Sequence, residues 1–227
     1  MAVGRPEQRV IVEAILVAAG RRPNIEGLGL DRIGVRAAAD GIEVNPRLAT
    51  SVRGIWAAGD VTGGMQFTHV ADAQARLVVR NALTPFKARW EGRAVPRVTY
   101  AEPELAQVGP TEQEAERSPE NTRVWRYDFA ELDRAIVDRR PEGFVKLVTT
   151  RRGRLLGATI VGAGAGNLIA PAVLAVQRGL HIGALAGFSY PYPTMSEGML
   201  RAAMMSRRAA LHSPGGRLLR WIVRLGL

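Results

Sequence analysis

Apolar residues in the first part of the chain form short runs typical of strands and one helical pattern. Residues 10–19 are almost wholly apolar and end in a Gly-Arg-Arg-Pro-Asn turn, which predicts a buried strand. Residues 41–44 and 54–58 predict two shorter strands, and apolar positions recur at helical spacing through residues 68–83. A strand as apolar as 10–19 needs sheet neighbours on both sides, so we expect these neighbours to come from outside these residues.

The pattern changes after residues 85–96, a polar stretch that we interpret as a linker between domains. Strands are predicted at residues 97–100, 123–127, 144–149 and 155–162, and helices at residues 167–178 and 194–207. Thr111 with Glu114, and Thr194 with Glu197, each have the spacing of a capping box at a helix start. Alternating short strands and capped helices predict an α+β layer with a mostly antiparallel sheet.

Residues 155–177 are long and uncharged enough to suggest a membrane span. Several glycines, Asn167 and Pro171 interrupt this stretch, however, so a buried strand followed by a buried helix explains it better. The glycines at residues 161–166, Val-Gly-Ala-Gly-Ala-Gly, have the wrong spacing for a dinucleotide fingerprint. We interpret them as sites of tight packing.

The amino-acid composition excludes some kinds of chemistry and some classes of partner. The 227 residues carry a formal charge of +10, but the basic residues are nearly all arginine and are scattered without interleaved aromatic residues, so we expect no nucleic-acid partner. The absence of cysteine excludes a disulfide, a thiolate metal site and a dithiol redox centre within these residues. No signal segment opens the sequence, which makes the cytoplasm the default location.

The final residues, 216–227, place three arginines at helical spacing among leucine, isoleucine and tryptophan. Two interpretations stay open for this basic tail. It could lie on a membrane surface as a peripheral contact, or it could cover an apolar patch on the body or on a partner.

The run Gly-Ile-Trp-Ala-Ala-Gly-Asp at residues 54–60 carries the strongest chemical signal. At Gly59 the backbone can approach a ligand closely, and Asp60 then offers a carboxylate acceptor to a sugar hydroxyl. This pattern indicates cofactor binding.

Four segments, in this order, resemble the C-terminal half of the flavin-dependent pyridine nucleotide-disulfide oxidoreductases, the family of dihydrolipoamide dehydrogenase and mercuric reductase. They are ILVAAGRRPN, GIWAAGD with FTHVADAQARLVVRNAL, VPRVTYAEPELAQVGPTEQEA, and SYPYPTMSEGMLRAA. The resemblance covers nearly all of residues 10–207. Within the family, the motifs look most like those of mercuric reductase-like members. It implies a remnant of the NAD(P)-binding domain at 1–19, the C-terminal segment of the FAD-binding domain at 20–90, a dimerisation domain at 91–207 and the basic tail at 208–227. The implied fold is therefore α/β and α+β: the end of a Rossmann-like region followed by a dimerisation domain with a mostly antiparallel sheet.

The resemblance also implies a cofactor site. Asp60, after Gly59, would hold the ribityl chain of FAD, and the backbone around Thr68 and His69 would face the flavin ring at a helix start, where the helix dipole stabilises negative charge. Alternatives remain for two of these residues. Asp60 could be a turn or N-cap aspartate, and the His69 side chain is better explained as a packing or hydrogen-bonding group than as a proton carrier.

Tyr192 and Glu197 are the candidate catalytic residues. In the disulfide-reducing members of the family, a histidine that shuttles a proton stands at the position of Tyr192, and a glutamate that orients it stands at Glu197. A tyrosine, with a pKa of about 10, cannot act as that base near neutral pH. The stretch instead resembles mercuric reductase, in which a tyrosine here helps to form the metal-substrate pocket. A tyrosine packed across a dimer interface, and a Glu197 that caps a helix with Thr194 for about 1 kcal/mol, are the structural alternatives.

In the complete enzyme that the resemblance implies, NAD(P)H reduces FAD and a cysteine pair carries electrons to the substrate. The glycine-rich FAD turn and the cysteines are absent from these residues, so we expect them to be inactive alone. We expect a homodimer, with a partner chain as a source of the N-terminal FAD and NAD(P) domains. The alternative function is a non-catalytic dimerisation or interaction module from a split or decayed gene.

Overall fold

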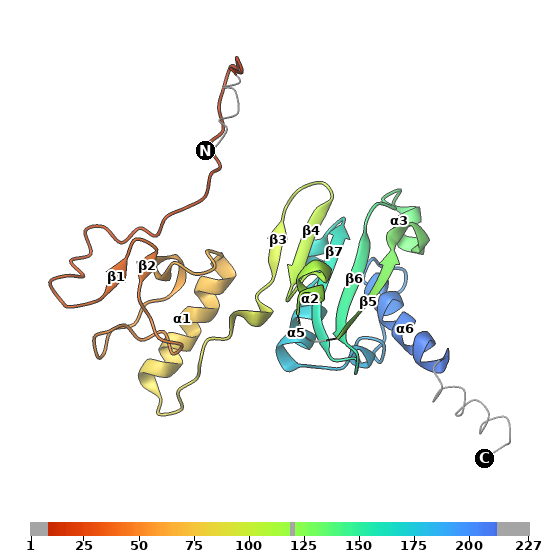
Figure 1. The fold of residues 1–227 in the computed structure, drawn as a ribbon. Coiled ribbons are helices and arrows are strands. Elements are labelled where there is room, and N and C mark those ends of the chain that lie inside the picture. The colour runs from red at the N-terminus through yellow and green to blue at the C-terminus, as the bar shows by residue number, and fades with distance from the viewer. Residues whose placement is uncertain (1–8, 119–120, 213–227) are drawn as a thin grey trace, which may run out of the picture. The chain divides into compact units, whose positions relative to one another are not determined.

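The computed structural model describes residues 9–118 and 121–212, which divide into two compact units (Figure 1). Unit 1 ends at Trp90 and unit 2 begins at Glu91. Each unit has its own apolar cluster, so each is described by itself.

Unit 1 consists of a small hairpin, a short 3-10 helix and one long helix. Strands β1 (Ala37–Ala38) and β2 (Gly41–Ile42) pair antiparallel, η1 covers Gly59–Thr62, and α1 covers Thr68–Leu83. The predicted helix at residues 68–83 is confirmed. The apolar cluster beside the hairpin has only three buried members, Val35, Ile42 and Ala57, with partly buried neighbours around them.

The predicted buried strand at residues 10–19 is wrong for this structure. All ten residues are exposed and none lies in a strand; Leu16, for example, is 91% exposed. A strand needs partners for its backbone N–H and C=O groups, and no described residue pairs with this segment. The predicted strand at 54–58 is also reduced, to a single antiparallel bridge between Ala49 and Trp56.

Unit 2 is built on a five-stranded antiparallel sheet. The strands are β3 (Arg97–Thr99), β4 (Glu104–Val108), β5 (Thr122–Asp128), β6 (Phe144–Thr150) and β7 (Leu155–Gly162), in the spatial order β3-β4-β7-β6-β5. The predicted antiparallel α+β layer is confirmed. Strand β4 was missed because its apolar and polar residues do not alternate: Ala106, Gln107 and Val108 are all buried.

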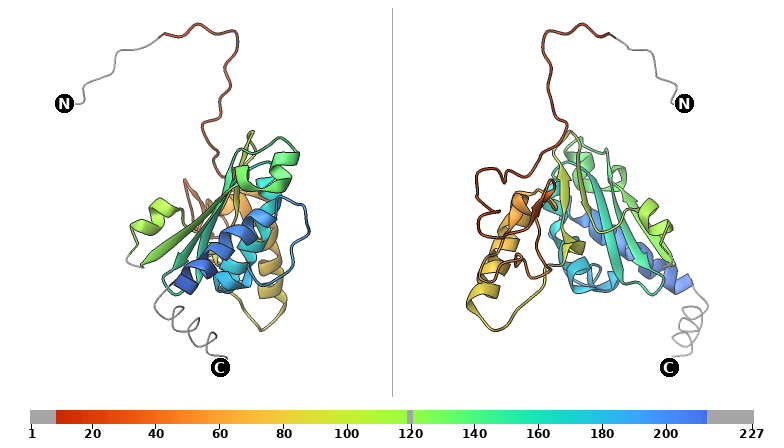
Figure 2. Two further views of the ribbon diagram at one scale, coloured as in Figure 1. Left: turned by 90° about the vertical axis from the view of Figure 1, so that its right-hand side faces the viewer. Right: turned by 60° about the vertical axis from the view of Figure 1, so that its left-hand side comes forward.

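Helices cover the two faces of this sheet unequally (Figure 2). Helices α4 (Ala165–Leu168), α5 (Ala170–Arg178) and α6 (Glu197–His212) lie on one face, and the short α2 (Glu112–Glu116) lies on the other. The remaining short elements are η2 (Gly92–Ala94), η3 (Phe129–Glu131), α3 (Asp133–Val137) and η4 (Ile182–Ala184). The main core fills the space between the sheet and α4 to α6; its fully buried members include Ala106, Val108, Leu147, Ala158, Ile160, Ala172, Ala202 and Ala203.

The helix boundaries in unit 2 confirm one predicted cap and correct another. The capping box at Thr111 and Glu114 is present, with Glu114 N–H donating to Thr111 Oγ1 at 3.2 Å and Thr111 N–H donating to Glu114 Oε2 at 2.8 Å. The capping box at Thr194 and Glu197 is wrong. Helix α6 begins three residues later than predicted, and the Thr194 hydroxyl bonds to Pro191 O at 2.7 Å and to Ser196 Oγ at 2.6 Å.

The apolar stretch at residues 155–177 forms β7 followed by α4 and α5, as predicted, although the single expected helix is broken at Ile169. Gly179 closes α5 in the left-handed conformation, with φ +62°. None of the helices in residues 9–118 and 121–212 has the length and hydropathy of a membrane span. Helix α6 extends into the predicted tail as far as His212, and the rest of that tail lies outside the described residues.

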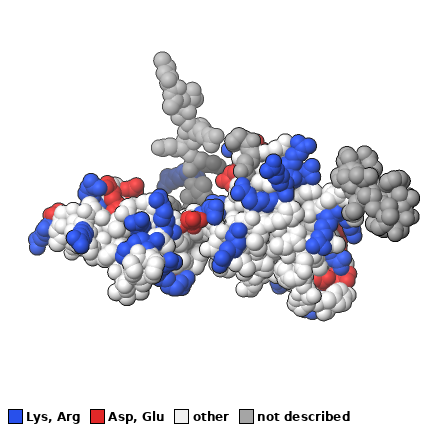
Figure 3. All heavy atoms as spheres, turned by 90° about the horizontal axis from the view of Figure 1, so that it is seen from below, with Lys and Arg blue, Asp and Glu red and all other residues white. Residues whose placement is uncertain are grey.

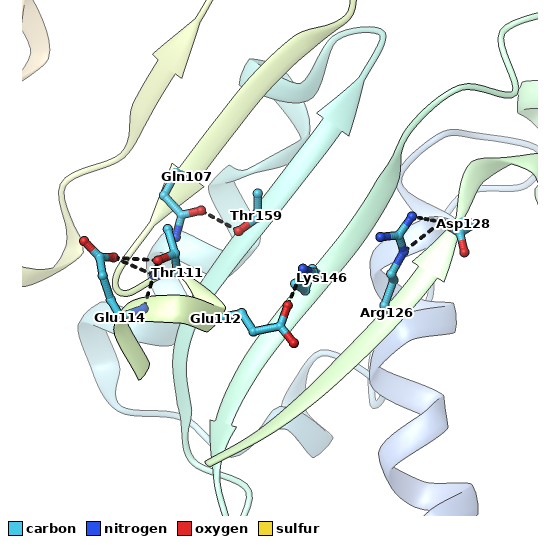
Figure 4. Close-up of polar contacts among 8 residues, drawn as sticks. All are labelled: Gln107, Thr111, Glu112, Glu114, Arg126, Asp128, Lys146 and Thr159. Atoms are coloured by element: carbon cyan, nitrogen blue, oxygen red, sulfur yellow. Dashed lines mark hydrogen bonds and ion pairs between the residues drawn. The ribbon is translucent and has the colours of Figure 1, made fainter. Parts of the chain in front are cut away.

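The sheet face that carries α2 is lined by polar side chains in pairs (Figure 4). Thr159 on β7 hydrogen-bonds to Gln107 on β4, Lys146 on β6 pairs with Glu112 on α2, and Arg126 on β5 pairs with Asp128 on the same strand. These side chains point to the opposite face from Ala106, Leu147 and Ala158, as the two-residue period of a strand requires.

Candidate functional site

The Gly59–Asp60 turn in unit 1 is fixed by contacts with α1. Gly59 has φ +77°, and a Cβ atom there would lie 2.9 Å from the Cβ of Ala71, so the backbone passes directly against the helix. The Gly59 N–H donates a 2.7 Å hydrogen bond to Oε1 of Gln74, which is 5% exposed. Asp60 follows this buried anchor and its side chain is exposed. The carboxylate is therefore presented outward from a rigid turn.

The N-terminus of α1 is open toward solvent. The N-cap residue Phe67 is extended and makes no side-chain cap, and Thr68 and His69 in the first turn are exposed. The rings of Phe67 and His69 stack, with their centroids 5.2 Å apart. An uncapped helix start offers backbone N–H groups and the positive end of the helix dipole to an electron-rich group. Asp60, on the η1 turn that packs against α1, adds a hydrogen-bond acceptor to these N–H donors. The acceptor and the donors together fit the hydroxyls and the ring of a flavin nucleotide.

Gln74 is the residue that sequence reasoning missed in unit 1. It lies one turn after Val70 on the buried face of α1, where an amide is unusual. A polar residue inside the apolar stripe of a predicted helix was the available signal. Its role in the fold is to satisfy the N–H of Gly59 and so to position Asp60.

In unit 2, Tyr192 lies in the loop before α6 and is 68% exposed. Its hydroxyl donates a 3.1 Å hydrogen bond to Oδ2 of Asp133, the first residue of α3. That hydrogen bond, and the negative charge of the same carboxylate, raise the pKa of Tyr192 above its usual value. The phenol, which is neutral at physiological pH in any case, therefore stays protonated to a higher pH than an ordinary tyrosine. No sequence pattern signalled Asp133, because it lies 59 residues earlier in the chain.

Glu197 is buried at the start of α6, with 6% of its surface exposed. Its Oε1 lies 3.5 Å from Nη2 of Arg201, one turn along the helix. The charges of both residues act on Tyr192: Glu197 raises the pKa of the phenol and Arg201 lowers it, each less than Asp133 does. Asp133, Tyr192, Glu197 and Arg201 therefore form a group through their charges, and among the described residues no hydrogen bond joins Tyr192 to Glu197. Within residues 9–118 and 121–212, no cluster of three or more His, Cys, Asp or Glu side chains could hold a metal ion.

Tyr127 on β5 belongs to the same group. Its hydroxyl donates a 2.7 Å hydrogen bond to the backbone oxygen of Glu131, and burial raises the pKa of this phenol as well. Neither tyrosine is a proton acceptor near neutral pH, so neither phenol can act as a general base.

This fold and arrangement define a class of protein, and family models agree. The model described as "Pyridine nucleotide-disulphide oxidoreductase, dimerisation domain" matches residues 95–203, and "Pyridine nucleotide-disulphide oxidoreductase" matches residues 2–75. The chain belongs to the pyridine nucleotide-disulphide oxidoreductase family, which is a family of FAD-dependent enzymes. The resemblance and the fold class inferred from the sequence are confirmed.

Individual relatives include both enzymes suggested by the motifs. The chain is 38% identical over 218 residues to dihydrolipoyl dehydrogenase of Thermus scotoductus, covering 93% of this chain and 46% of the relative. It is 40% identical over 204 residues to a mercuric reductase of Staphylococcus aureus, covering 89% and 37%. Among solved structures, the Cu(II) complex of the HOCl-induced flavoprotein disulfide reductase RclA from Escherichia coli matches with a TM-score of 0.82 and 29% identity, covering 89% of this chain and 46% of that one. The chain thus spans less than half the length of each of these relatives.

Proposed function

We propose that this chain forms the dimerisation domain and the closing segment of the FAD-binding domain of an NAD(P)H-dependent flavoenzyme similar to mercuric reductase and dihydrolipoyl dehydrogenase. The observation that carries the proposal is the hydrogen bond from Tyr192 to Asp133, in the loop that precedes the buried Glu197 in the sequence. A neutral phenol, rather than a proton-shuttling imidazole, therefore lies in the loop before α6.

In unit 1, Asp60 would accept hydrogen bonds from ribityl hydroxyls of FAD, and Gly59 would allow the cofactor to approach the backbone. The N–H groups at Thr68 and His69 would stabilise negative charge on the flavin ring. When bound, FAD supplies hydride and electron transfer between NAD(P)H and the acceptor. The support for this assignment is the exposed carboxylate and the uncapped helix start described above.

In unit 2, Tyr192 and Glu197 would contribute to the substrate pocket of the partner subunit in a homodimer. The Tyr192 proton is engaged by Asp133, so the outward-facing oxygen lone pairs are available to accept a hydrogen bond or to contact a metal-ion substrate. The charges of Glu197 and Arg201 would set the electrostatic potential at the Tyr192 hydroxyl. Reduction of a disulfide that needs a histidine base is not the activity we propose.

We propose further that these 227 residues are inactive alone, because they contain no cysteine to relay electrons and no glycine-rich turn for the FAD pyrophosphate. The missing parts would come from a partner chain, and the working location would be the cytoplasm. A peripheral membrane contact of the basic tail remains part of this proposal.

The test is to purify the chain and measure its mass in solution, its flavin absorbance and its NAD(P)H oxidation. We expect a dimer without NAD(P)H-dependent electron transfer. Electron transfer by the chain alone would overturn the inactivity, and stoichiometric FAD in a stable dimer would mean that the missing elements are not needed for binding.

The alternative function is a non-catalytic dimerisation module. One observation favours it: unit 2 has a complete sheet with helical cover and a large core, whereas the cluster in unit 1 has three buried members. A colourless and stable dimer whose mass and stability do not change when FAD is added would support the module.

A further inference from the structure

Three arginines lie at one end of the unit 2 sheet and have no carboxylate partner among residues 9–118 and 121–212. Arg123 lies on β5, and Arg151 and Arg152 lie in the turn between β6 and β7. Within the described part of the chain, none of the three side chains makes an ion pair or a hydrogen bond. Other arginines of unit 2 are paired, such as Arg126 with Asp128, Arg134 with Asp138 and Arg140 with Glu102. Like charges held close together repel, and an anion would relieve that repulsion.

The three side chains line a cavity of about 130 Å³. A single water needs only about 10–15 Å³ on this measure, so the cavity has room for a group larger than water. Arg151 and Arg152 also line an adjoining surface hollow of about 420 Å³ together with Asn121, Thr150 and Arg154. None of the described residues that line the two spaces is acidic.

The walls of the smaller cavity are built and ordered by polar contacts. Thr149 is fully buried and accepts a 3.1 Å hydrogen bond from Nε1 of Trp125. His181 accepts the N–H of Gly183 at its Nδ1, at 2.9 Å, and its Nε2 lies against the turn at Gly153. A Cβ atom on Gly153 would lie 2.2 Å from that Nε2, so the ring packs directly on the turn that carries the arginines.

We propose that this arginine cavity binds the phosphate group of a small organic phosphate, with the rest of the ligand in the adjoining hollow. A guanidinium group presents paired N–H donors whose geometry matches phosphate oxygens, and three such groups here reach one cavity from two segments of the chain. Figure 3 looks onto this end of the sheet and shows groups of Lys and Arg side chains over unit 2. The cavity is small, which favours a compact anion over an extended polymer. This site is independent of the flavin proposal.

The test is isothermal titration of the full chain with pyrophosphate and with inorganic phosphate, in a phosphate-free buffer of low ionic strength. We expect saturable binding of one pyrophosphate per chain, with a shift of the Trp125 indole resonance in NMR spectra. The variant R151A/R152A should weaken binding at least tenfold. R151K/R152K, which keeps the charge and loses the guanidinium fork, should also weaken it, but less.

The matched control is Arg134→Ala, which removes the same charge from an arginine that is paired with Asp138. It should leave pyrophosphate affinity unchanged. Circular dichroism checks that each variant folds. If R151A/R152A does not fold, Arg123→Ala tests the same cavity from β5. Absence of saturable binding, or equal loss in the Arg134 control, would overturn the proposal. So would a short DNA duplex that displaces pyrophosphate at far lower concentration, because that result would define a polyanion surface.

Discussion

The Tyr192 hydroxyl and the Asp133 carboxylate are joined by a 3.1 Å hydrogen bond that ties the loop before α6 to the start of α3. The bond orients an otherwise exposed ring, because the hydroxyl is its only polar atom. It also raises the pKa of the phenol, since an anionic acceptor favours the form that carries the proton.

Replacing Asp133 with Asn should lower the pKa of Tyr192 toward its ordinary value of 10. The raised pKa belongs to the folded state, so its contribution to stability is present below pH 10 and is lost as the pH rises through the folded-state pKa. In the variant this contribution, and with it the loss above pH 10, should become smaller. NMR titration of the Tyr192 ring measures the pKa directly.

The control for this experiment is Glu131→Gln, which removes a neighbouring carboxylate whose charge acts on Tyr127 but which does not bond to Tyr192. It should leave the Tyr192 titration nearly unchanged. An unaltered Tyr192 pKa in the Asp133 variant would show that the hydrogen bond does not persist in solution.

Local patterns in the sequence were sufficient for α1, β7 and the cap at Thr111, because each depends on residues within a few positions. Local patterns gave wrong predictions where a contact between residues far apart in the chain decides the structure. Residues 10–19 have strand composition, but a strand also requires a partner, and no described residue supplies one.

The same limit applies to the candidate site. Tyr192 and Glu197 could be picked out from one short motif, whereas Asp133 and Gln74 act through contacts that span 59 and 15 residues. The start of α6 shows why the predicted cap failed. A Cβ built on Gly198 would lie 2.7 Å from Phe129, so the first turn packs closely on the core, and the Thr194 hydroxyl bonds to Pro191 and Ser196 instead of capping it.

Tyr190 should tolerate replacement by phenylalanine without loss of stability. Its hydroxyl is buried and has no hydrogen-bond partner among the described residues, and burial raises its pKa to about 12. An unpaired buried hydroxyl costs about 1–3 kcal/mol, so its removal should leave the free energy of unfolding unchanged or higher. Urea denaturation followed by circular dichroism gives the comparison.

Tyr127→Phe is the matched control, because that hydroxyl does have a partner, the backbone oxygen of Glu131. It should lower the free energy of unfolding by about 1 kcal/mol. A comparable loss for Tyr190→Phe would mean that an ordered water satisfies the Tyr190 hydroxyl.

The capping box at the start of α2 predicts a specific dependence on pH. The backbone N–H and the hydroxyl of Thr111 both bond to the Glu114 carboxylate and lower its pKa below the ordinary 4.5. The stabilisation is therefore present above pH 4.5 and is lost as the pH falls through the lowered folded-state pKa. Thr111→Ala should cost about 1 kcal/mol at neutral pH and should reduce this acid sensitivity.

Denaturation of each variant from pH 7 down to about pH 3 checks the sign. Glu116→Gln, on the same helix but outside the box, serves as the control for a change of charge alone. If Thr111→Ala and the wild type lose stability in parallel with acid, the Thr111 hydroxyl does not contribute to the lowered Glu114 pKa.

Gly162 and Gly164 should respond very differently to alanine, although both belong to the Val-Gly-Ala-Gly-Ala-Gly run. A Cβ on Gly162 would lie 2.4 Å from Cε2 of the fully buried Phe129, whereas the nearest atom to a Cβ on Gly164 is Asn167 Nδ2 at 3.9 Å. Both have positive φ, which costs alanine about 1–2 kcal/mol by itself. The clash adds about 1–3 kcal/mol at Gly162 only, because Phe129 has no room to retreat from the core. Urea denaturation of the two variants should therefore separate them by at least about 1 kcal/mol, and equal losses would contradict the interpretation of Gly162 as a packing glycine.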